Sequence, residues 1–191
     1  MKFPTVELRL PDWVSGVVSG DRAYPDSESK MNLAVELARR NVERGTGGPF
    51  GAAIFDRKTG RLVAPGVNLV TSANCSVAHA EMVAIMIAQK VEETFDLGSG
   101  ERDFVLYTST EPCAMCLGAV PWSGVRHLVC AARDGDARAV GFDEGTKAEN
   151  WERALAERGI TVARDVLREE AAEVLRFYIE RGGKLYNSRE G

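Results

Sequence analysis

The sequence predicts an α/β fold in which helices cover both faces of a mixed sheet, giving three layers. Short apolar runs of strand length alternate with longer segments of helical periodicity, which is typical of a layered α/β domain. The first two strand-like runs are separated by the turn Lys58-Thr59-Gly60 and therefore pair as a hairpin. The later strands need helical crossovers, so some neighbours are parallel and the sheet is mixed.

Each element is predicted from local signals. Residues 26–44 have apolar side chains at helical spacing, with Ser27 or Ser29 as the cap and Gly45 at the end. The apolar run at 51–55 is typical of a buried strand. The same criteria give further strands at 61–70, 104–108, 125–132 and 160–164, further helices at 78–91, 112–122, 150–158 and 168–181, and a short helix or turn at 134–140.

A length of 191 residues predicts one domain with a full core. Residues 1–25 are rich in proline and glycine, and we interpret them as an arm with one short strand at most, packed through Trp13. Residues 26–191 form the main domain, which ends in a tail that starts at about residue 182. No internal repeat or low-complexity linker interrupts the chain.

The composition of the chain indicates which binding partners and which cellular compartment to expect. The net charge is −4 and the sequence pI is about 5.4, so a nucleic-acid partner is not expected. The N-terminus is interrupted by charges and a proline, and no run approaches a membrane span, so neither a signal peptide nor a membrane partner is expected. With four cysteines in the chain, we expect a reducing, cytoplasmic location.

Two short motifs supply candidate metal ligands. Cys113 and Cys116 stand at i and i+3, which places both sulfurs on one face of a helix. Pro112 favours a helix that begins there, and a cysteine at a helix N-terminus ionises readily to the thiolate that binds metal. His79 adds a ring nitrogen. Three ligands leave one tetrahedral position open, as in catalytic zinc sites, whereas structural zinc sites have four protein ligands.

Glu81 is the predicted proton carrier. A carboxylate is not the expected partner of two thiolates, yet Glu81 lies two residues after His79. Side chains at i and i+2 diverge in the middle of a helix, so both face one pocket only in the first turn of a helix that begins near Ala78. The combined pattern H-x-E…P-C-x-x-C is that of the zinc nucleobase deaminases.

These motifs leave alternatives open. Cys113 and Cys116 could form a redox pair, or the whole set could hold a structural zinc in a protein without catalytic activity. Cys75 lies close to His79 in the sequence and, as a fourth ligand, would close the site. Glu81 counts against a structural zinc site, because such a site has no use for a proton carrier.

From about Asp26 to the C-terminus the chain resembles the cytidine-deaminase-like zinc hydrolases, and within them the bacterial guanine deaminases. Guanine deaminases of this fold have Gly-Phe-Asp followed by an acid, which the chain matches at residues 141–144. The resemblance implies a three-layer α/β/α sandwich with a mixed five-stranded sheet, and a homodimer. It is carried by the stretches Gly47-Gly48-Pro49-Phe50-Gly51-Ala52, His79-Ala80-Glu81, Thr110-Glu111-Pro112-Cys113-Ala114-Met115-Cys116, Trp122-Ser123-Gly124 and Gly141-Phe142-Asp143-Glu144.

The resemblance also implies roles at the reaction centre. His79, Cys113 and Cys116 match the Zn²⁺ ligands of the family. Glu81 matches its proton shuttle, and Glu144 matches a second catalytic acid that touches the purine. Many relatives have Asp at that second position, so the longer side chain of Glu144 could shift the fit of the pocket. Without the resemblance, Glu144 would be interpreted as a solvated loop acid.

Four further residues match substrate contacts of the family. Phe50, Asn68 and Trp122 match positions that line the base pocket, and Tyr186 lies in a tail that relatives place over a partner's active site. Each has a plainer explanation: the two aromatic side chains at 50 and 122 are equally suited to a core, and Asn68 could cap a strand end. His127, the other histidine, is interpreted as structural.

The implied activity is hydrolysis of the nucleobase guanine to xanthine and ammonia. Glu81 would move a water proton to N3 of the base and then supply a proton to the departing amine. Guanosine, cytosine, cytidine and ammeline offer equivalent chemistry, so they remain alternative substrates. A tRNA adenosine deaminase shares the zinc set but requires a basic face, which the acidic composition does not favour.

Overall fold

In the computed structural model, residues 2–18 and 23–187 are described, and they contain five strands and seven helices. Residues 1 and 19–22 of the predicted arm and residues 188–191 of the predicted tail lie outside the described residues. The strands are β1 (Gly51–Asp56), β2 (Leu62–Val67), β3 (Phe104–Thr110), β4 (His127–Ala132) and β5 (Thr161–Ala163). The helices are α1 (Trp13–Val17), α2 (Ser27–Glu43), α3 (Ala80–Val91), α4 (Ala114–Ser123), α5 (Asp134–Ala139), α6 (Trp151–Ala156) and α7 (Arg168–Glu180).

The strands form one mixed sheet in the order β2-β1-β3-β4-β5. β1 runs antiparallel to both β2 and β3, because the hairpin turn reverses the chain. β3, β4 and β5 are parallel and are joined by helical crossovers. The predicted mixed five-stranded sheet and the predicted hairpin are therefore confirmed.

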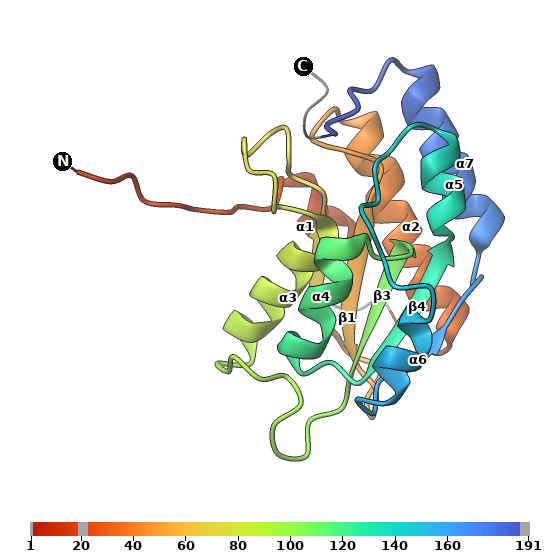
Figure 1. Cartoon of the computed structure of the whole chain (residues 1–191). Helices are drawn as coiled ribbons and strands as arrows, with labels where there is room; N and C mark the ends of the chain where they lie inside the picture. The colour runs from red at the N-terminus through yellow and green to blue at the C-terminus, as the bar shows by residue number, and fades with distance from the viewer. Residues whose placement is uncertain (1, 19–22, 188–191) are drawn as a thin grey trace.

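Helices cover both faces of the sheet, which confirms the three-layer sandwich (Figure 1). Successive strand residues point to opposite faces. Phe55 of β1 belongs to the core that includes side chains of α2, α5 and α7, whereas its neighbour Ile54 belongs to the core that includes side chains of α3, α4 and α6. Both residues are fully buried, so β1 lies at the centre of the two cores.

α2 shows how local chemistry fixes an element. Its cap is Asp26, not Ser27 or Ser29: the Asp26 carboxylate accepts from the N–H of Ser29 at 2.7 Å, and the Ser29 hydroxyl accepts from the N–H of Asp26 at 3.2 Å. Gly45, at a φ of 63°, follows the helix as predicted. α2 has 17 residues, and no helix in the described parts of the chain is long and apolar enough to cross a membrane.

The described residues of the arm form the short helix α1, which was not predicted, and they contain no strand. Trp13 anchors α1 as predicted: it packs against the core, and its Nε1 donates to Oγ1 of Thr46 at 3.1 Å. Phe3 and Val6 lie further toward the N-terminus and are about four-fifths exposed, at 80% and 81%. This segment leaves the body of the domain beside α3 (Figure 1).

Candidate active site

The first motif lies at the tip of α3. His79 is the residue before the helix and has an extended backbone, with φ −70° and ψ 157°, so α3 begins at Ala80 and Glu81 lies in its first turn. Gly66 of β2 allows this tip to sit close to the sheet, because a Cβ at Gly66 would stand 2.2 Å from the carbonyl oxygen of Ala80. The structure therefore confirms a helix that begins close to Ala78 and holds both side chains over one pocket.

The second motif lies at the tip of α4, directly after β3. Cys113 is the residue before the helix and Cys116 lies in its first turn, so Pro112 precedes the helix and does not open it. Cys116 is fully buried. Because β3 and β4 are parallel neighbours, their carboxyl ends form the edge at which α/β folds bind ligands.

The two tips bring the predicted metal ligands together. One ligand atom each from His79, Cys113 and Cys116 lies within 4.8 Å of the others, and Sγ of Cys113 lies 3.5 Å from Nδ1 of His79. Two sulfurs with one imidazole are the ligands that zinc prefers, and three of them leave a position for water. Cys75, which is half-buried, is outside this group, so the described residues fit an open site rather than a closed one.

The pKa values of the site reflect burial and the contact between the two thiols. The hydrogen bond with Cys116, working against burial, lowers the pKa of Cys113 to about 4, so Cys113 is a thiolate. The same contact, and burial, raise the pKa of Cys116. Burial, and then the negative Cys113, raise the pKa of Glu81 and bring that of Glu144 to about 8. The raised pKa values show that these acidic groups disfavour one another's ionised forms in the absence of a cation, and a divalent cation would stabilise those ionised forms.

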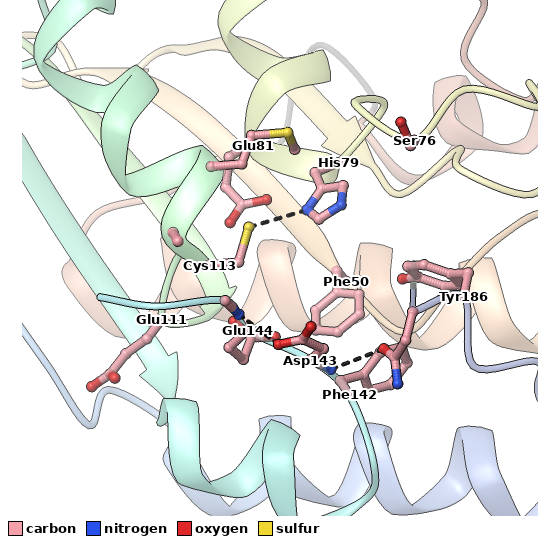
Figure 2. A pocket seen from close by; sticks show the side chains of 14 residues that line it. Phe50, Ser76, His79, Glu81, Glu111, Cys113, Phe142, Asp143, Glu144 and Tyr186 are labelled. Carbon is pink, nitrogen blue, oxygen red and sulfur yellow. Dashed lines mark hydrogen bonds between the residues drawn. The ribbon is translucent and has the colours of Figure 1, made fainter. Parts of the chain in front are cut away.

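These groups line a cavity of about 300 Å³. His79, Glu81 and Cys113 form one side, and Glu144 approaches them from the loop after α5 (Figure 2). Glu144 is only 5% exposed, which excludes a solvated loop acid. The cavity is at the small end of the range for ligand pockets, about 300–1,000 Å³, and therefore suits a compact ligand.

The loop that carries Glu144 is held by its main chain. The carbonyl of Glu144 accepts from the N–H of Ala114 at 2.9 Å, which ties the loop to the first residue of α4. Arg138 donates to the carbonyl of Gly145 at 2.6 Å. The two catalytic candidates at 81 and 144 thus come from separate elements that are both fixed relative to Cys113.

An aromatic wall closes the cavity on the other side. The rings of Phe50 and Phe142 meet edge-on with centroids 4.9 Å apart, and the ring of Tyr186 lies 5.4 Å from that of Phe142. Tyr186 belongs to the tail of the same chain, so here the tail covers its own site (Figure 2). The Tyr186 hydroxyl is buried without a hydrogen-bond partner, which leaves it available to a ligand.

Asn68 lies directly behind this wall. Its N–H donates to the carbonyl of Phe50 at 3.0 Å, and its Oδ1 accepts from the N–H groups of Gly48 and Val70 at 3.4 and 3.2 Å. Asn68 is fully buried, and its Nδ2 has no partner. It borders the wall and does not itself line the cavity.

Trp122 is not part of this cavity. Its side chain is 86% exposed near the end of α4, and it borders a separate groove between α4 and α6. The prediction that Trp122 lines the base pocket is therefore wrong for the cavity that the single chain forms. His127 lies away from the site, with Nε2 3.0 Å from Asp103, as expected of a structural residue.

The site residues that were not predicted from the sequence include Phe142 of the aromatic wall, Glu111 and Asn187. Glu111 is buried after β3, where its carboxylate accepts from Arg164 at 2.6 Å and from the N–H of Asp134 at 3.0 Å, and so holds the segment before Cys113. Asn187 lines the cavity from the tail. Glu111 lies inside the second motif, so its place in that motif was the signal that could have identified it as a site residue. Asn187 belongs to no motif that could have identified it.

A His/Cys/Cys ligand set at two helix tips, with a buried glutamate two residues after the histidine, defines the class of zinc-dependent hydrolytic deaminases. Residues 25–132 match the family described as the cytidine and deoxycytidylate deaminase zinc-binding region, and the chain belongs to this family.

Individual relatives extend the similarity over most of the chain. The guanine deaminase of Bacillus subtilis (strain 168) is 42% identical over 133 residues, which cover 70% of this chain and 81% of the relative. A structure of guanine deaminase from Nitrosomonas europaea is 44% identical with a TM-score of 0.87, covering 91% of this chain and 96% of the other. A structure solved in complex with 2,6-diaminopurine is 45% identical with a TM-score of 0.89, covering 97% and 98%.

Proposed function

We propose that the protein is a guanine deaminase that hydrolyses guanine to xanthine and ammonia. The observation that carries the proposal is the pairing of two buried carboxylates, Glu81 and Glu144, in one small cavity with the His/Cys/Cys set. The choice of guanine is supported by the relatives, which include two guanine deaminases and a protein that binds the related purine 2,6-diaminopurine.

His79, Cys113 and Cys116 would hold the zinc ion. The metal supplies Lewis-acid chemistry that makes water nucleophilic at neutral pH. The proton transfers of the reaction are carried out by side chains of the protein.

Glu81 takes one proton from the attacking water and delivers it to N3 of guanine, which makes C2 electrophilic. A C2–O bond forms as the oxygen of water adds, and C2 becomes tetrahedral. The C2–N bond then breaks as the C2 hydroxyl gives up its proton and becomes a carbonyl, and this proton passes to the exocyclic nitrogen, which leaves as ammonia. Water and guanine together account for every atom of xanthine and ammonia, so no further reactant is required.

Glu144 shares the proton transfer to the departing amine. The amine and N3 are different atoms, and a single carboxylate would have to swing between them. Glu144 faces the same cavity from a separate loop, so it can serve the second atom while Glu81 serves the first (Figure 2).

The aromatic wall positions the planar base. Phe50, Phe142 and Tyr186 bring ring surfaces to one side of the cavity, where a purine gains both burial and ring contacts. The unpartnered Tyr186 hydroxyl lines the cavity and offers a hydrogen bond to the ring edge, and the unpartnered Nδ2 of Asn68, which borders the wall behind Phe50, is the second candidate donor. We therefore include both residues, with Phe50, among the substrate-binding residues.

We also propose a cytoplasmic homodimer. All four cysteines are free, which supports a reducing compartment. Most of the exposed large apolar side chains among the described residues lie on the arm, α3, α4 and adjacent loops, and they include Phe95 and Trp122. A Phe or Trp buries about 150–250 Å². Phe95 and Trp122 therefore supply a substantial part of the ~800 Å² per partner that a stable interface buries.

The proposed reaction is tested by ammonia release. The zinc-replete protein is offered guanine, guanosine, adenine, cytosine, cytidine and tRNA in parallel. We expect release from guanine, weak or no release from the others, and none from Glu81→Gln, whose amide keeps its shape but cannot carry a proton. Preference for cytidine or tRNA, or wild-type turnover by Glu81→Gln, would contradict the proposal.

A further inference from the structure

Asn41 lies in the last turns of α2 and has no role in the reaction described above. Its side chain is fully buried, and its Nδ2 donates to two main-chain carbonyls, those of Gly48 at 2.9 Å and Asn68 at 2.8 Å. The two acceptors lie 7 and 27 residues further along the chain. Asn41 therefore clamps both segments that flank the β1–β2 hairpin, and these segments also bond to each other through the main-chain N–H and the Oδ1 of Asn68.

The orientation of the Asn41 amide follows from its partners. Trp13 Nε1 lies 3.1 Å from Oγ1 of Thr46, and an indole N–H can only donate. The Thr46 hydroxyl accepts this bond and is then free to donate to Oδ1 of Asn41, 2.7 Å away. Nδ2 must consequently face the two carbonyls, and every polar atom of the Asn41 amide is satisfied.

Both clamped segments reach the aromatic wall. The carbonyl of Gly48 also accepts from the N–H of Phe50 at 2.9 Å, and the N–H of Asn68 donates to the carbonyl of Phe50 at 3.0 Å. Phe50 itself lines the cavity. The main chain of Phe50 is thus hydrogen-bonded to Gly48 and to Asn68, and Asn41 in turn holds the carbonyls of both of these residues.

The main chain at Gly47 and Gly48 is tightly packed between Asn41, Asn68 and Tyr186. A Cβ at Gly47 would stand 1.9 Å from the carbonyl oxygen of Asn68 and 2.7 Å from Nδ2 of Asn41. A Cβ at Gly48 would stand 2.2 Å from the hydroxyl of Tyr186. The glycines allow the segment to lie between the clamp and the tail, so a shift of this segment would be transmitted to Phe50 and Tyr186.

We propose that Asn41 is a positioning residue for base recognition: by holding the main chain of residues 48 and 68, it fixes Phe50 and the carboxamide of Asn68 in the geometry that receives the purine. This inference rests on the proposed function for its substrate. It predicts an effect on binding rather than on the chemical step, because Asn41 touches neither the ligand set nor either carboxylate.

The test compares three variants. Asn41→Ala removes the clamp, and Thr46→Val removes the hydroxyl that orients it, which is also the acceptor of the Trp13 N–H. Tyr107→Phe is the matched control: it removes another part-buried side-chain bond of α2, the 3.2 Å contact with Ser27 at the opposite end of the helix. KM and kcat for guanine, zinc content and thermal unfolding are measured for each. The affinity for guanine is measured by calorimetry with Glu81→Gln added, which prevents turnover.

With two hydrogen bonds lost, we expect Asn41→Ala to raise KM and the dissociation constant about tenfold while kcat stays within about threefold and zinc content is unchanged. Thr46→Val should raise KM about threefold, and Tyr107→Phe should leave it unchanged. A lower unfolding temperature for Asn41→Ala with an unchanged KM and dissociation constant would reduce Asn41 to a structural role. If Asn41→Ala does not fold, an unchanged KM in Thr46→Val overturns the proposal.

Failure of the proposed function would appear separately, as a wild-type protein that neither turns over nor binds guanine. The positioning role then still has a readout without substrate. A crystal structure of Asn41→Ala should show the main chain of residues 48–50 displaced, and an unmoved segment would overturn the inference.

Discussion

Asn187 accepts a hydrogen bond from the main-chain N–H of Asp143 at 2.9 Å. Its Nδ2 donates to the carbonyl of Gly141 at 2.8 Å, so one side chain of the tail pairs with two main-chain groups of the loop just before Glu144. Leu185 packs against the same loop, because a Cβ at Gly141 would lie 2.8 Å from Cδ1 of Leu185. The tail and the acid-bearing loop therefore form one closed wall.

The first prediction follows from this pairing. Asn187→Ala should free the tail, raise KM for guanine about tenfold and speed tryptic cleavage after Lys184, since two hydrogen bonds are lost at once. Steady-state kinetics and timed proteolysis measure the two effects. Glu180→Ala, at the exposed end of α7, is the control and should change neither. Equal cleavage rates in both variants would show that Asn187 does not hold the tail.

The second prediction concerns the metal. Wild-type protein should contain about one zinc per chain, and Cys116→Ser should lose it, because a hydroxyl replaces a thiolate ligand. Cys75→Ser should keep its zinc, since Cys75 lies outside the ligand group. Elemental analysis decides both. Removal of zinc by a chelator should abolish turnover and lower the unfolding temperature. Zinc loss from Cys75→Ser would instead indicate a closed, four-ligand site.

The parts of the site that the sequence predicted are those whose chemistry is local. His79 and Glu81 are two residues apart, and Cys113 and Cys116 are three apart, so a helix start suffices to aim each pair. The five strands were likewise visible because each is a short apolar run between turn signals. Helix ends were predicted less well: Ser27 or Ser29 was the expected cap of α2, whereas the structure shows Asp26 as the cap, paired reciprocally with Ser29.

The parts that could not be predicted depend on contacts between distant segments. Asn187 pairs with residues 44 and 46 positions away, and Asn41 reaches a carbonyl 27 positions away. Trp122 illustrates the opposite error. An aromatic residue near a catalytic helix suggests a pocket wall, but the fold turns its side chain outward, and the wall is built from Phe50, Phe142 and Tyr186.

A third prediction concerns stability in acid. Arg168 donates two hydrogen bonds to Asp136, both at 2.9 Å, and they hold the pKa of Asp136 below its ordinary value of 3.8. A carboxylate with a lowered folded-state pKa contributes stability above its unfolded-state pKa and loses it as the pH falls through the folded-state pKa. The free energy of unfolding should therefore fall below about pH 4.

Asp136→Asn tests this assignment by urea unfolding at several pH values. The variant should be less stable than wild type near neutral pH, and the difference should shrink as the pH falls, because the amide has no charge to lose. A difference that stays constant down to about pH 3 would show that the ion pair does not contribute through its charge.

A fourth prediction tests the homodimer. Trp122→Ser should weaken self-association about tenfold or more, because an exposed aromatic at an interface is a typical hot spot. Ile179→Ser is the control: Ile179 is an exposed apolar residue on α7, on the other side of the sheet. Sedimentation equilibrium of the two variants and the wild type gives the dissociation constants. A monomeric wild type, or equal effects of both substitutions, would refute the proposed interface.

The last prediction concerns the second acid. Glu144 is 5% exposed and faces the cavity opposite Glu81, so it can hold the purine and deliver a proton to the departing amine. Glu144→Gln keeps the hydrogen-bonding shape but cannot transfer a proton, so kcat should fall much more than KM rises. Glu144→Asp should be milder because it retains the carboxyl group one methylene further back. Zinc content should remain that of the wild type in both, because Glu144 is not a ligand. A Glu144→Gln enzyme with near-normal kcat and only a raised KM would limit Glu144 to binding, and the proton for ammonia would then have to come from Glu81 alone.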